Sequence, residues 1–263
     1  MTLTTNVLRC CMLIGLCLAS VDSEPQRKAY PTSHLRDVVY TKPAVGLMGD
    51  TATQDQMWEQ YKCDDYFADT SSRPTDHTPI WNALKTLYYN EVVRHTRPHA
   101  NHTHEIQHLL SKRAMNVPYQ VTISPGKGLG VFSTTNIQKG HVIADYHSSG
   151  SFKLNRAADY RRLIRKADRQ DMQCLVLQCS CVTSPKSPRE YPRHQVVEAA
   201  QIQVDFDDWC FFNSGDRNDH PNVSQRHDRI HYHTLRDIAA GEEIVDNYRD
   251  FLNVPGGWRV FGL

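Results

Sequence analysis

The chain has 263 residues, 40% of them hydrophobic, and its 30 basic residues balance 29 acidic residues to give a formal net charge of +1. This length and composition are sufficient to bury one sizeable core. The balanced charge argues against a general attraction to nucleic acid or to an anionic membrane surface, so no direct nucleic-acid partner is expected. Partners must therefore be inferred from individual sites.

The first 23 residues have the pattern of a secretory signal peptide. Arg9 precedes an apolar stretch from Cys10 to Ala19, and residues 21–23 supply a site for cleavage. The stretch is shorter than the roughly 20 apolar residues of a membrane-spanning helix, and no later stretch is apolar enough to span a bilayer. An uncleaved anchor and a buried terminal helix remain the alternatives.

Five cysteines lie beyond this segment, and an odd number would leave at least one thiol free in an oxidising compartment. They are Cys63, Cys174, Cys179, Cys181 and Cys210. Two glycosylation sequons, at Asn101 and Asn222, fit a secretory route, although such triplets are common by chance.

Five histidines crowd residues 95–108. A surface zinc or copper site is one interpretation of this stretch, and solvated loop histidines are the other. The clustered cysteines at 174, 179 and 181 are more typical of buried thiols than of a structural metal site, which needs four ligands. No metal ligand is therefore assigned.

The N-terminal part divides into two stretches. Residues 24–53 are polar and contain three prolines, which indicates an extended arm or linker. Over residues 54–116 the pattern is helical, with a cap at Thr78, Pro79 in the first helical turn and a second short helix over residues 103–114. The apolar face of the helix after Thr78 consists of Ile80, Leu84, Leu87, Tyr88 and Val92.

From residue 117 the hydrophobic period shortens to that of β-strands. Apolar residues alternate with polar ones at Tyr119, Val121 and Ile123. One helix is predicted over residues 155–171, and residues 251–263 form a C-terminal tail. Further short strands are predicted over residues 141–147, 174–181, 200–206, 230–235 and 243–248. The expected fold class is α+β, mostly β, with a helical N-terminal segment before a domain at residues 117–250.

Three separated motifs have residue types suited to ligand binding. Residues 126–133 read GKGLGVFS, and their glycines allow close approach of the backbone to a ligand or positive φ angles. A strand pattern follows where a dinucleotide fingerprint needs a helix, so that function is excluded. A simple hairpin is the alternative interpretation.

The second motif is an apolar run that ends at Asn213 and Ser214. The Asn213 amide can offer a donor and an acceptor to a zwitterionic ligand, and a turn capped by Asn is an equally good interpretation. The third motif, residues 241–248, reads GEEIVDNY and forms a turn and a strand that ends at Tyr248. The Tyr248 hydroxyl then faces either a cleft or the core.

In this order and spacing, the three motifs resemble those of the SET-domain family of protein lysine methyltransferases, which use S-adenosylmethionine (SAM). Residues 128–133 match the family's opening motif, residues 213–222 match its asparagine and proline-asparagine motif, and residues 241–248 match its closing motif. Two residues depart from the pattern: Ser214 stands where the family usually has histidine, and Asn247 where it usually has aspartate.

The resemblance implies a SET-type domain of small β-sheets, in which the second and third motifs thread past one another in a knot-like arrangement. It implies Tyr248 as the catalytic residue. The implied SAM-binding residues are Gly128, Leu129, Gly130, Asn213 and Ser214. Aromatic side chains suit a methylated ammonium through cation–π attraction, and the candidates for substrate binding are Tyr146 and Trp258, with Phe261 as a further one.

The expected function is transfer of a methyl group from SAM to a lysine side chain of a protein, by a monomer. The departures at Ser214 and Asn247 and the export signal favour an alternative, a catalytically degenerate SET-like binding module in the secretory pathway. The signal indicates the secretory pathway, whereas the family resemblance indicates the nucleus or cytoplasm.

Overall fold

A computed structural model describes residues 51–69, 76–94, 102–185, 191–215, 220–225, 230–248 and 254–263. The expected signal peptide, almost all of the expected arm and the sequon residue Asn101 lie outside the described residues. Among the residues described, no helix is both long enough and apolar enough to cross a membrane.

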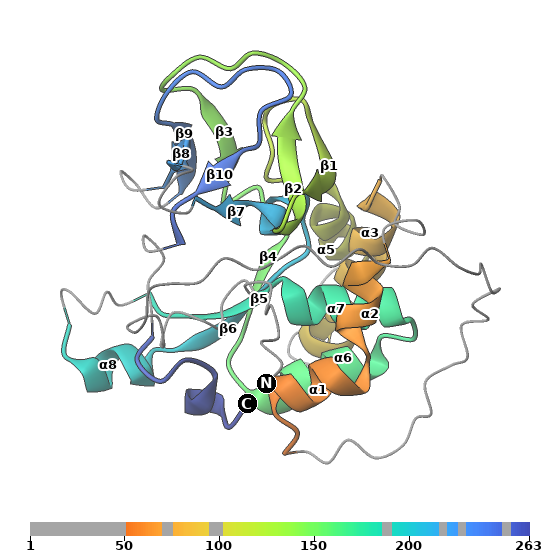
Figure 1. The fold of residues 1–263 in the computed structure, drawn as a ribbon. Helices are drawn as coiled ribbons and strands as arrows, with labels where there is room; N and C mark the ends of the chain where they lie inside the picture. Colours follow the sequence, from red (N-terminus) through yellow and green to blue (C-terminus); the bar gives the residue numbers. More distant parts are fainter. Residues whose placement is uncertain are drawn as a thin grey trace, which may run out of the picture.

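The first helices form where the sequence predicts a helical N-terminal segment (Figure 1). They are α1 (Gln54–Gln60), α2 (Cys63–Ala68), α3 (Thr78–Tyr88), the π-helix η1 (Tyr89–Val93) and α5 (His102–Ser111). A capping box between Thr53 and Gln56 starts α1. The predicted start of α3 is correct, since the helix begins at Thr78 with Pro79 in its first turn.

Ten short strands within the described ranges form small sheets. β1 (Tyr119–Ser124) and β2 (Gly128–Ser133) are an antiparallel hairpin, β3 (Val142–Asp145) joins β9 (His231–Thr234) and β8 (Val223–Ser224), and β4 (Ser151–Leu154) joins β6 (Gln201–Asp205) and β5 (Ser180–Thr183). β7 (Asn213–Ser214) pairs in parallel with β10 (Val245–Asp246). The predicted α+β class with small β-sheets is confirmed.

The expectation of a mostly β fold was wrong, because helices hold 41% of the described residues and strands 24%. The predicted helix over residues 155–171 is two helices, α6 (Ala157–Lys166) and α7 (Gln170–Gln178), and the strand predicted over residues 174–181 begins only at Ser180. All residues from Met172 to Leu177 are buried, including the polar Gln173, and the apolar run Cys174–Leu177 fits a buried strand as well as a buried helix. The short helices α8 (Arg193–Glu198), η2 (Asp208–Phe211) and η4 (Gly257–Phe261) were not predicted.

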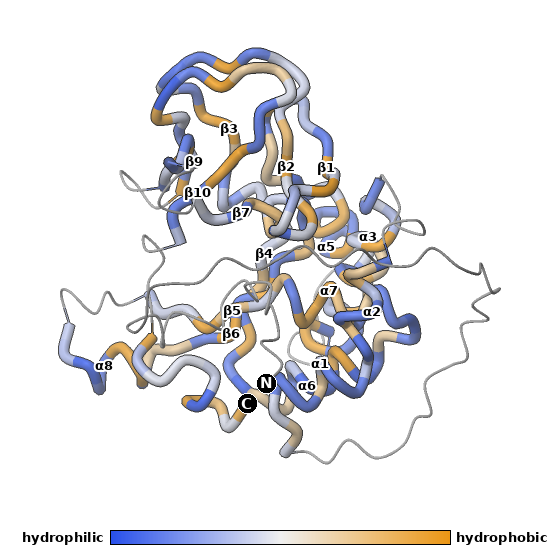
Figure 2. The backbone as a smooth tube through the Cα atoms, in the orientation of Figure 1, coloured by the Kyte–Doolittle hydropathy of each residue, from blue (hydrophilic) through white to orange (hydrophobic). Residues whose placement is uncertain are grey.

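One hydrophobic core joins the N-terminal helices to the strands. Buried side chains of α1 and α3, such as Met57 and Leu84, belong to the same cluster as Val131 in β2 and Ile202 in β6. Figure 2 shows the corresponding hydrophobic stretches in both strands and helices, for example along β3 and α7. The helical segment is therefore packed into the domain that carries the three motifs.

Candidate functional site

Two glycines of the first motif are required for different structural reasons. Gly128 has a φ of 87°, which only glycine adopts easily, at the turn of the β1–β2 hairpin. Gly130 has no such constraint, but a Cβ there would lie 2.4 Å from Glu243 Oε1 and 3.0 Å from Asn213 Nδ2. Gly130 is therefore the position where all three motifs come close together.

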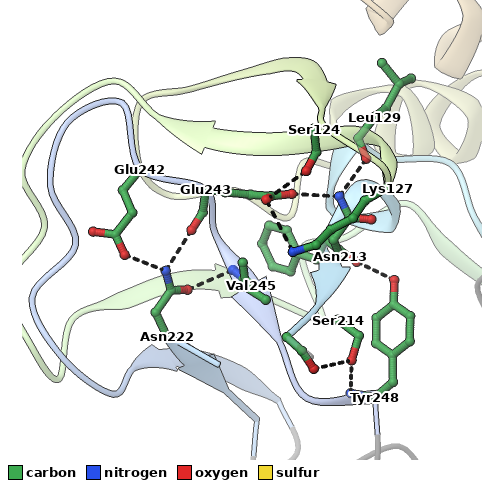
Figure 3. Close-up of polar contacts among 12 residues, drawn as sticks. Ser124, Lys127, Leu129, Asn213, Ser214, Asn222, Glu242, Glu243, Val245 and Tyr248 are labelled. Carbon is green, nitrogen blue, oxygen red and sulfur yellow. Dashed lines mark hydrogen bonds and ion pairs between the residues drawn. The ribbon is translucent and has the colours of Figure 1, made fainter. Parts of the chain in front are cut away.

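The Glu243 carboxylate holds the three motifs together (Figure 3). Asn213 Nδ2 donates to Glu243 Oε1 at 2.7 Å, and Ser124 Oγ donates to Oε2 at 2.9 Å. The Lys127 ammonium lies 3.8 Å from the same carboxylate, and Asn213 Nδ2 also donates to the Leu129 carbonyl at 2.9 Å. Sequence reasoning missed Glu243 as a site residue, although its place in the GEE motif was a signal.

The second and third motifs also pair along the backbone. Asn213 and Ser214 lie opposite Val245 and Asp246 in the parallel pair β7–β10. The Gly215 amide donates to the Asp246 carbonyl at 2.9 Å. The knot-like threading of these segments stays a prediction.

Asn222 fixes the other side of the final strand and is 1% exposed. Its Oδ1 accepts from the Val245 amide at 2.8 Å, while its Nδ2 donates to the Glu243 carbonyl at 2.7 Å and to Glu242 Oε1 at 3.1 Å. The folded chain thus uses the amide nitrogen to which an N-linked glycan would be attached. The Asn222 side chain therefore has a structural role in the folded state.

Tyr248 is buried next to Asn213. Its Oη donates to the Phe212 carbonyl at 2.6 Å, and its backbone amide donates to Ser214 Oγ at 3.4 Å. The hydroxyl is thus fixed at the peptide group that precedes Asn213. Gly130, Asn213 and Tyr248, which are far apart in sequence, are linked through these contacts.

A row of aromatic rings connects this corner to Tyr146. The ring centres of Tyr146 and Trp209 are 5.8 Å apart, those of Trp209 and Tyr232 are 5.6 Å apart, and those of Tyr232 and Phe212 are 5.6 Å apart. Sequence reasoning did not select Trp209, Phe212 or Tyr232. The aromatic run at residues 209–212 was a signal for the first two, whereas Tyr232 only fits the alternation of a strand.

A cluster of polar side chains lies next to Tyr146 at the end of this row. Tyr146 Oη donates to Gln203 Oε1 at 3.2 Å, and Gln203 Nε2 donates to Asp205 Oδ1 at 3.0 Å. Ser151 Oγ also donates to Asp205. Burial raises the pKa of Asp205 to about 6, and it raises the pKa of Tyr146 well above its usual range. The Tyr146 phenol is therefore neutral and acts as a donor.

Trp258 contacts a different part of the molecule from Tyr146 and Tyr248. Its ring stacks on Tyr160 of α6 at a centroid distance of 5.4 Å, and Arg161 of the same helix donates to the Gly262 carbonyl. Figure 1 draws the dark blue C-terminal turn low in the view, away from β2, β7 and β10. The described contacts give Trp258 a packing role and do not join it to Tyr146 or Tyr248.

Four of the five cysteines that the structure describes are paired. Disulfides join Cys63 to Cys174 and Cys179 to Cys210, and Cys181 is a free thiol. Within the described ranges, no group of three or more His, Cys, Asp or Glu side chains is placed to hold a metal ion. His95 and His99 of the histidine-rich stretch lie outside those ranges.

Residues 128–249 match the family model of the SET domain. A search of curated proteins found no match. Among solved structures, the SET domain of the RIZ1 tumour suppressor is 18% identical over 50% of this chain and 69% of its own, with a TM-score of 0.28. The Neurospora SET-domain protein DIM-5, a histone lysine methyltransferase, is 15% identical over 51% and 53%, with a TM-score of 0.31. CpSET8 from Cryptosporidium is 13% identical over 75% and 96%, also at 0.31.

Because these TM-scores are low, the assignment of the domain rests on the family model, whose match contains the three linked motifs described above. The three linked motifs therefore lie within the match to the SET domain over residues 128–249, a little under half of the chain. Members of that family are typically protein lysine methyltransferases.

Proposed function

We propose that the chain is a SAM-dependent methyltransferase that acts on a lysine side chain of a protein, with Tyr248 as its catalytic residue. The observation that carries the proposal is the linked corner of Gly130, Asn213 and Tyr248. Asn213 reaches the glycine strand through the Leu129 carbonyl, and Tyr248 reaches the peptide group before Asn213 through its hydroxyl.

The side chains around Gly130 fit the amino-acid end of SAM, which carries an ammonium and a carboxylate. The Leu129 carbonyl and the Glu243 carboxylate are acceptors, while the Lys127 ammonium and the Asn213 amide are donors. A Cβ at Gly130 would overlap Glu243 Oε1, so these polar atoms lie directly against the backbone of the glycine strand. When bound, SAM supplies a methyl group that its positive sulfonium makes electrophilic.

The buried rings suit the other reactant, a lysine side chain. Trp209, Phe212 and Tyr232 are buried, and such surroundings disfavour an ammonium without a partner, so they favour the neutral amine that methyl transfer requires. Their faces also attract a methylated ammonium product. The Tyr248 hydroxyl, held by the Phe212 carbonyl, is a fixed dipole that can orient the amine.

Calorimetric titration of SAM into the purified chain, followed by transfer of a radiolabelled methyl group to whole-cell extract, tests the proposal. We expect Tyr248→Phe to keep SAM affinity within about threefold and to lower the transfer rate by at least about tenfold. Tyr191→Phe makes the same chemical change at an exposed tyrosine and should keep the wild-type rate. A chain that binds no SAM, or a Tyr248→Phe variant of unchanged rate, would contradict the proposal.

The alternative is a SET-like binding module without turnover. Ser214 favours it, because its hydroxyl makes two long hydrogen bonds within the described residues: it donates to the neighbouring Gly215 carbonyl at 3.3 Å and accepts from the Tyr248 amide at 3.4 Å. The same experiment separates the two functions, since a binding module binds SAM or a protein but labels nothing in the extract.

A secretory location is proposed together with either function. The disulfides Cys63–Cys174 and Cys179–Cys210 support it, because such bonds persist in oxidising compartments. Expression of a tagged full chain in cultured cells, with the tag followed in medium and cytosol, tests the location. Recovery of reduced protein from the cytosol alone would overturn it.

A further inference from the structure

We propose that helix α3 of the N-terminal segment positions the Phe212 carbonyl and, through it, the Tyr248 hydroxyl, and that Asp208 is the positioning residue through which it acts. The inference rests on the proposed function for its activity readout, while its structural readout needs no ligand. Asp208 is the first residue of η2, the four-residue helix that ends directly before Phe212.

Asp208 receives hydrogen bonds from two elements that are distant in sequence. Trp81 Nε1 of α3 donates to its Oδ1 at 2.6 Å, and Tyr119 Oη of β1 donates to its Oδ2 at 2.8 Å. Burial and the neighbouring Asp208 charge raise the pKa of Tyr119 well above its usual range, so the phenol keeps the proton that it donates. Asp208 is thus a charged acceptor fixed from two sides, and bonds to charged acceptors are the stronger kind.

A second residue of α3 faces the same segment. Lys85 lies one helical turn after Trp81, and its Nζ donates to the Lys112 carbonyl at 2.8 Å. Burial lowers the pKa of Lys85 to about 8, and the carboxylates of Asp207 and Asp208 oppose this lowering. The Asp207 carboxylate is in turn fixed by the Ala114 amide at 2.7 Å. One face of α3 therefore carries Trp81, which binds Asp208, and Lys85, whose charge interacts with both carboxylates.

The end of η2 also packs on α3. The ring centre of Phe211 lies 5.1 Å from that of His77 and 5.9 Å from that of Trp81. A 3₁₀ turn of four residues has few internal hydrogen bonds, so its position depends on such side-chain contacts. The next carbonyl, that of Phe212, is the acceptor for Tyr248 Oη, so a shift of η2 moves the proposed catalytic hydroxyl.

Asn213 is held differently. Its amide is bound to the Leu129 carbonyl and to Glu243, neither of which belongs to η2. Loosening α3 from Asp208 should therefore disturb the Tyr248 hydroxyl more than the proposed SAM contacts. This difference gives the inference a signature that a general loss of stability would not produce.

The chain offers a closely matched pair of variants. Trp81 and Trp58 are 3% and 5% exposed, and each donates its indole N–H to an aspartate, since Trp58 Nε1 binds Asp64 Oδ1 at 2.9 Å. Trp81→Phe removes the bond to Asp208, whereas Trp58→Phe removes an equivalent bond within α1 and α2. Hydrogen exchange measured by mass spectrometry reports both effects on the full chain without a ligand.

We expect Trp81→Phe to speed exchange in residues 207–215 by about tenfold or more, and Trp58→Phe to change exchange only within residues 54–69. In methyl transfer, Trp81→Phe should lower kcat by about tenfold while SAM affinity changes by less than about threefold. Tyr119→Phe removes the other donor to Asp208 and should also lower kcat. This variant replaces Trp81→Phe in the test if Trp81→Phe fails to fold.

The two proposals can fail separately. Equal exchange in residues 207–215 for the Trp81→Phe and Trp58→Phe variants would overturn the positioning role, whatever the activity. A kcat unchanged in both Trp81→Phe and Tyr119→Phe would overturn it as well. A wild-type chain that neither binds SAM nor transfers a methyl group would overturn the proposed function. The exchange measurement would still test whether α3 positions η2.

Discussion

Glu243 and Gly130 are a matched pair of residues at the meeting point of three segments. The carboxylate reaches Asn213 and Ser124 only because position 130 has no side chain. Gly130, which first indicated a ligand site, is therefore also required by contacts within the protein itself. A ligand and Glu243 would share the same group of polar contacts.

Replacement of Gly130 by Ala should lower the free energy of unfolding by about 1–3 kcal/mol, because the new Cβ would overlap Glu243 Oε1 and press on Asn213 and Ser124. Urea unfolding measures the change. Glu243→Ala removes the overlapping atom, so the double variant should lose less stability than the two single variants together. Additive losses would show that the overlap is not the cause.

Asp205 makes stability depend on pH in an unusual direction. Its pKa is raised from 3.8 to about 6, first of all by burial, so the folded chain holds this proton more tightly than the unfolded chain. The stability that the protonated form contributes is fully present below about pH 3.8 and is lost as the pH rises through about 6. Asp205→Asn should flatten this slope and should leave the protein at least as stable at pH 7 as wild type, in urea titrations across this range.

Asp145 provides the opposite case as a control. Burial acts to raise its pKa, but hydrogen bonds from Ser148 and from the His147 amide lower it below its usual value. Its contribution to stability is therefore present at neutral pH and is lost on acidification, so Asp145→Asn should destabilise the protein at pH 7. Similar pH slopes for the two variants would contradict both assignments.

At the scale of elements, Asn222 ties the loop before β8 to the final strand through both ends of its amide. Asn222→Asp keeps the acceptor for the Val245 amide but places a carboxylate against Glu242 and the Glu243 carbonyl. Because the group is buried, we expect a loss of about 2–4 kcal/mol in the free energy of unfolding. Chemical denaturation at pH 7 measures it.

Asn136 offers the control, because its Oδ1 accepts from the exposed Ala240 amide at 2.9 Å and an aspartate can do the same. Asn136→Asp should change stability by less than about 0.5 kcal/mol. Equal losses in the two variants would mean that the buried donors of Asn222 are not what matters.

The sequence predicted the elements whose hydrophobic period is clear. It placed the start of α3 and the strand β1, although the alternation breaks at Ile123, which is exposed. It also selected Gly130, Asn213 and Tyr248, because these stand in motifs with fixed order. It failed for α7, where an apolar run buried on all sides has no period that distinguishes helix from strand. Tyr232 was missed because its role arises from pairing with Trp209 of a distant element, which the local pattern around Tyr232 does not contain.

For the whole molecule, the N-terminal helices and the SET domain form one unit through side-chain bonds, packing and a disulfide. Cys63 of α2 is joined to Cys174 of α7, across 111 residues of sequence, and Gln54 of α1 donates to the Leu177 carbonyl of α7. The second disulfide joins Cys179, directly after α7, to Cys210 within η2. Both crosslinks therefore run from α7, one to the N-terminal helices and the other to the segment before Asn213.

Removal of the longer crosslink by Cys63→Ala with Cys174→Ala should lower the free energy of unfolding by about 2–5 kcal/mol, because closing so long a loop restricts the unfolded chain. Cys181→Ala, which removes a thiol outside both disulfides, should cost less than about 1 kcal/mol. Urea unfolding of oxidised protein measures both, and alkylation before reduction should modify Cys181 but not Cys63 or Cys174. An equal cost for the two variants, or alkylation of native Cys63, would show that α2 and α7 are not crosslinked in the folded chain.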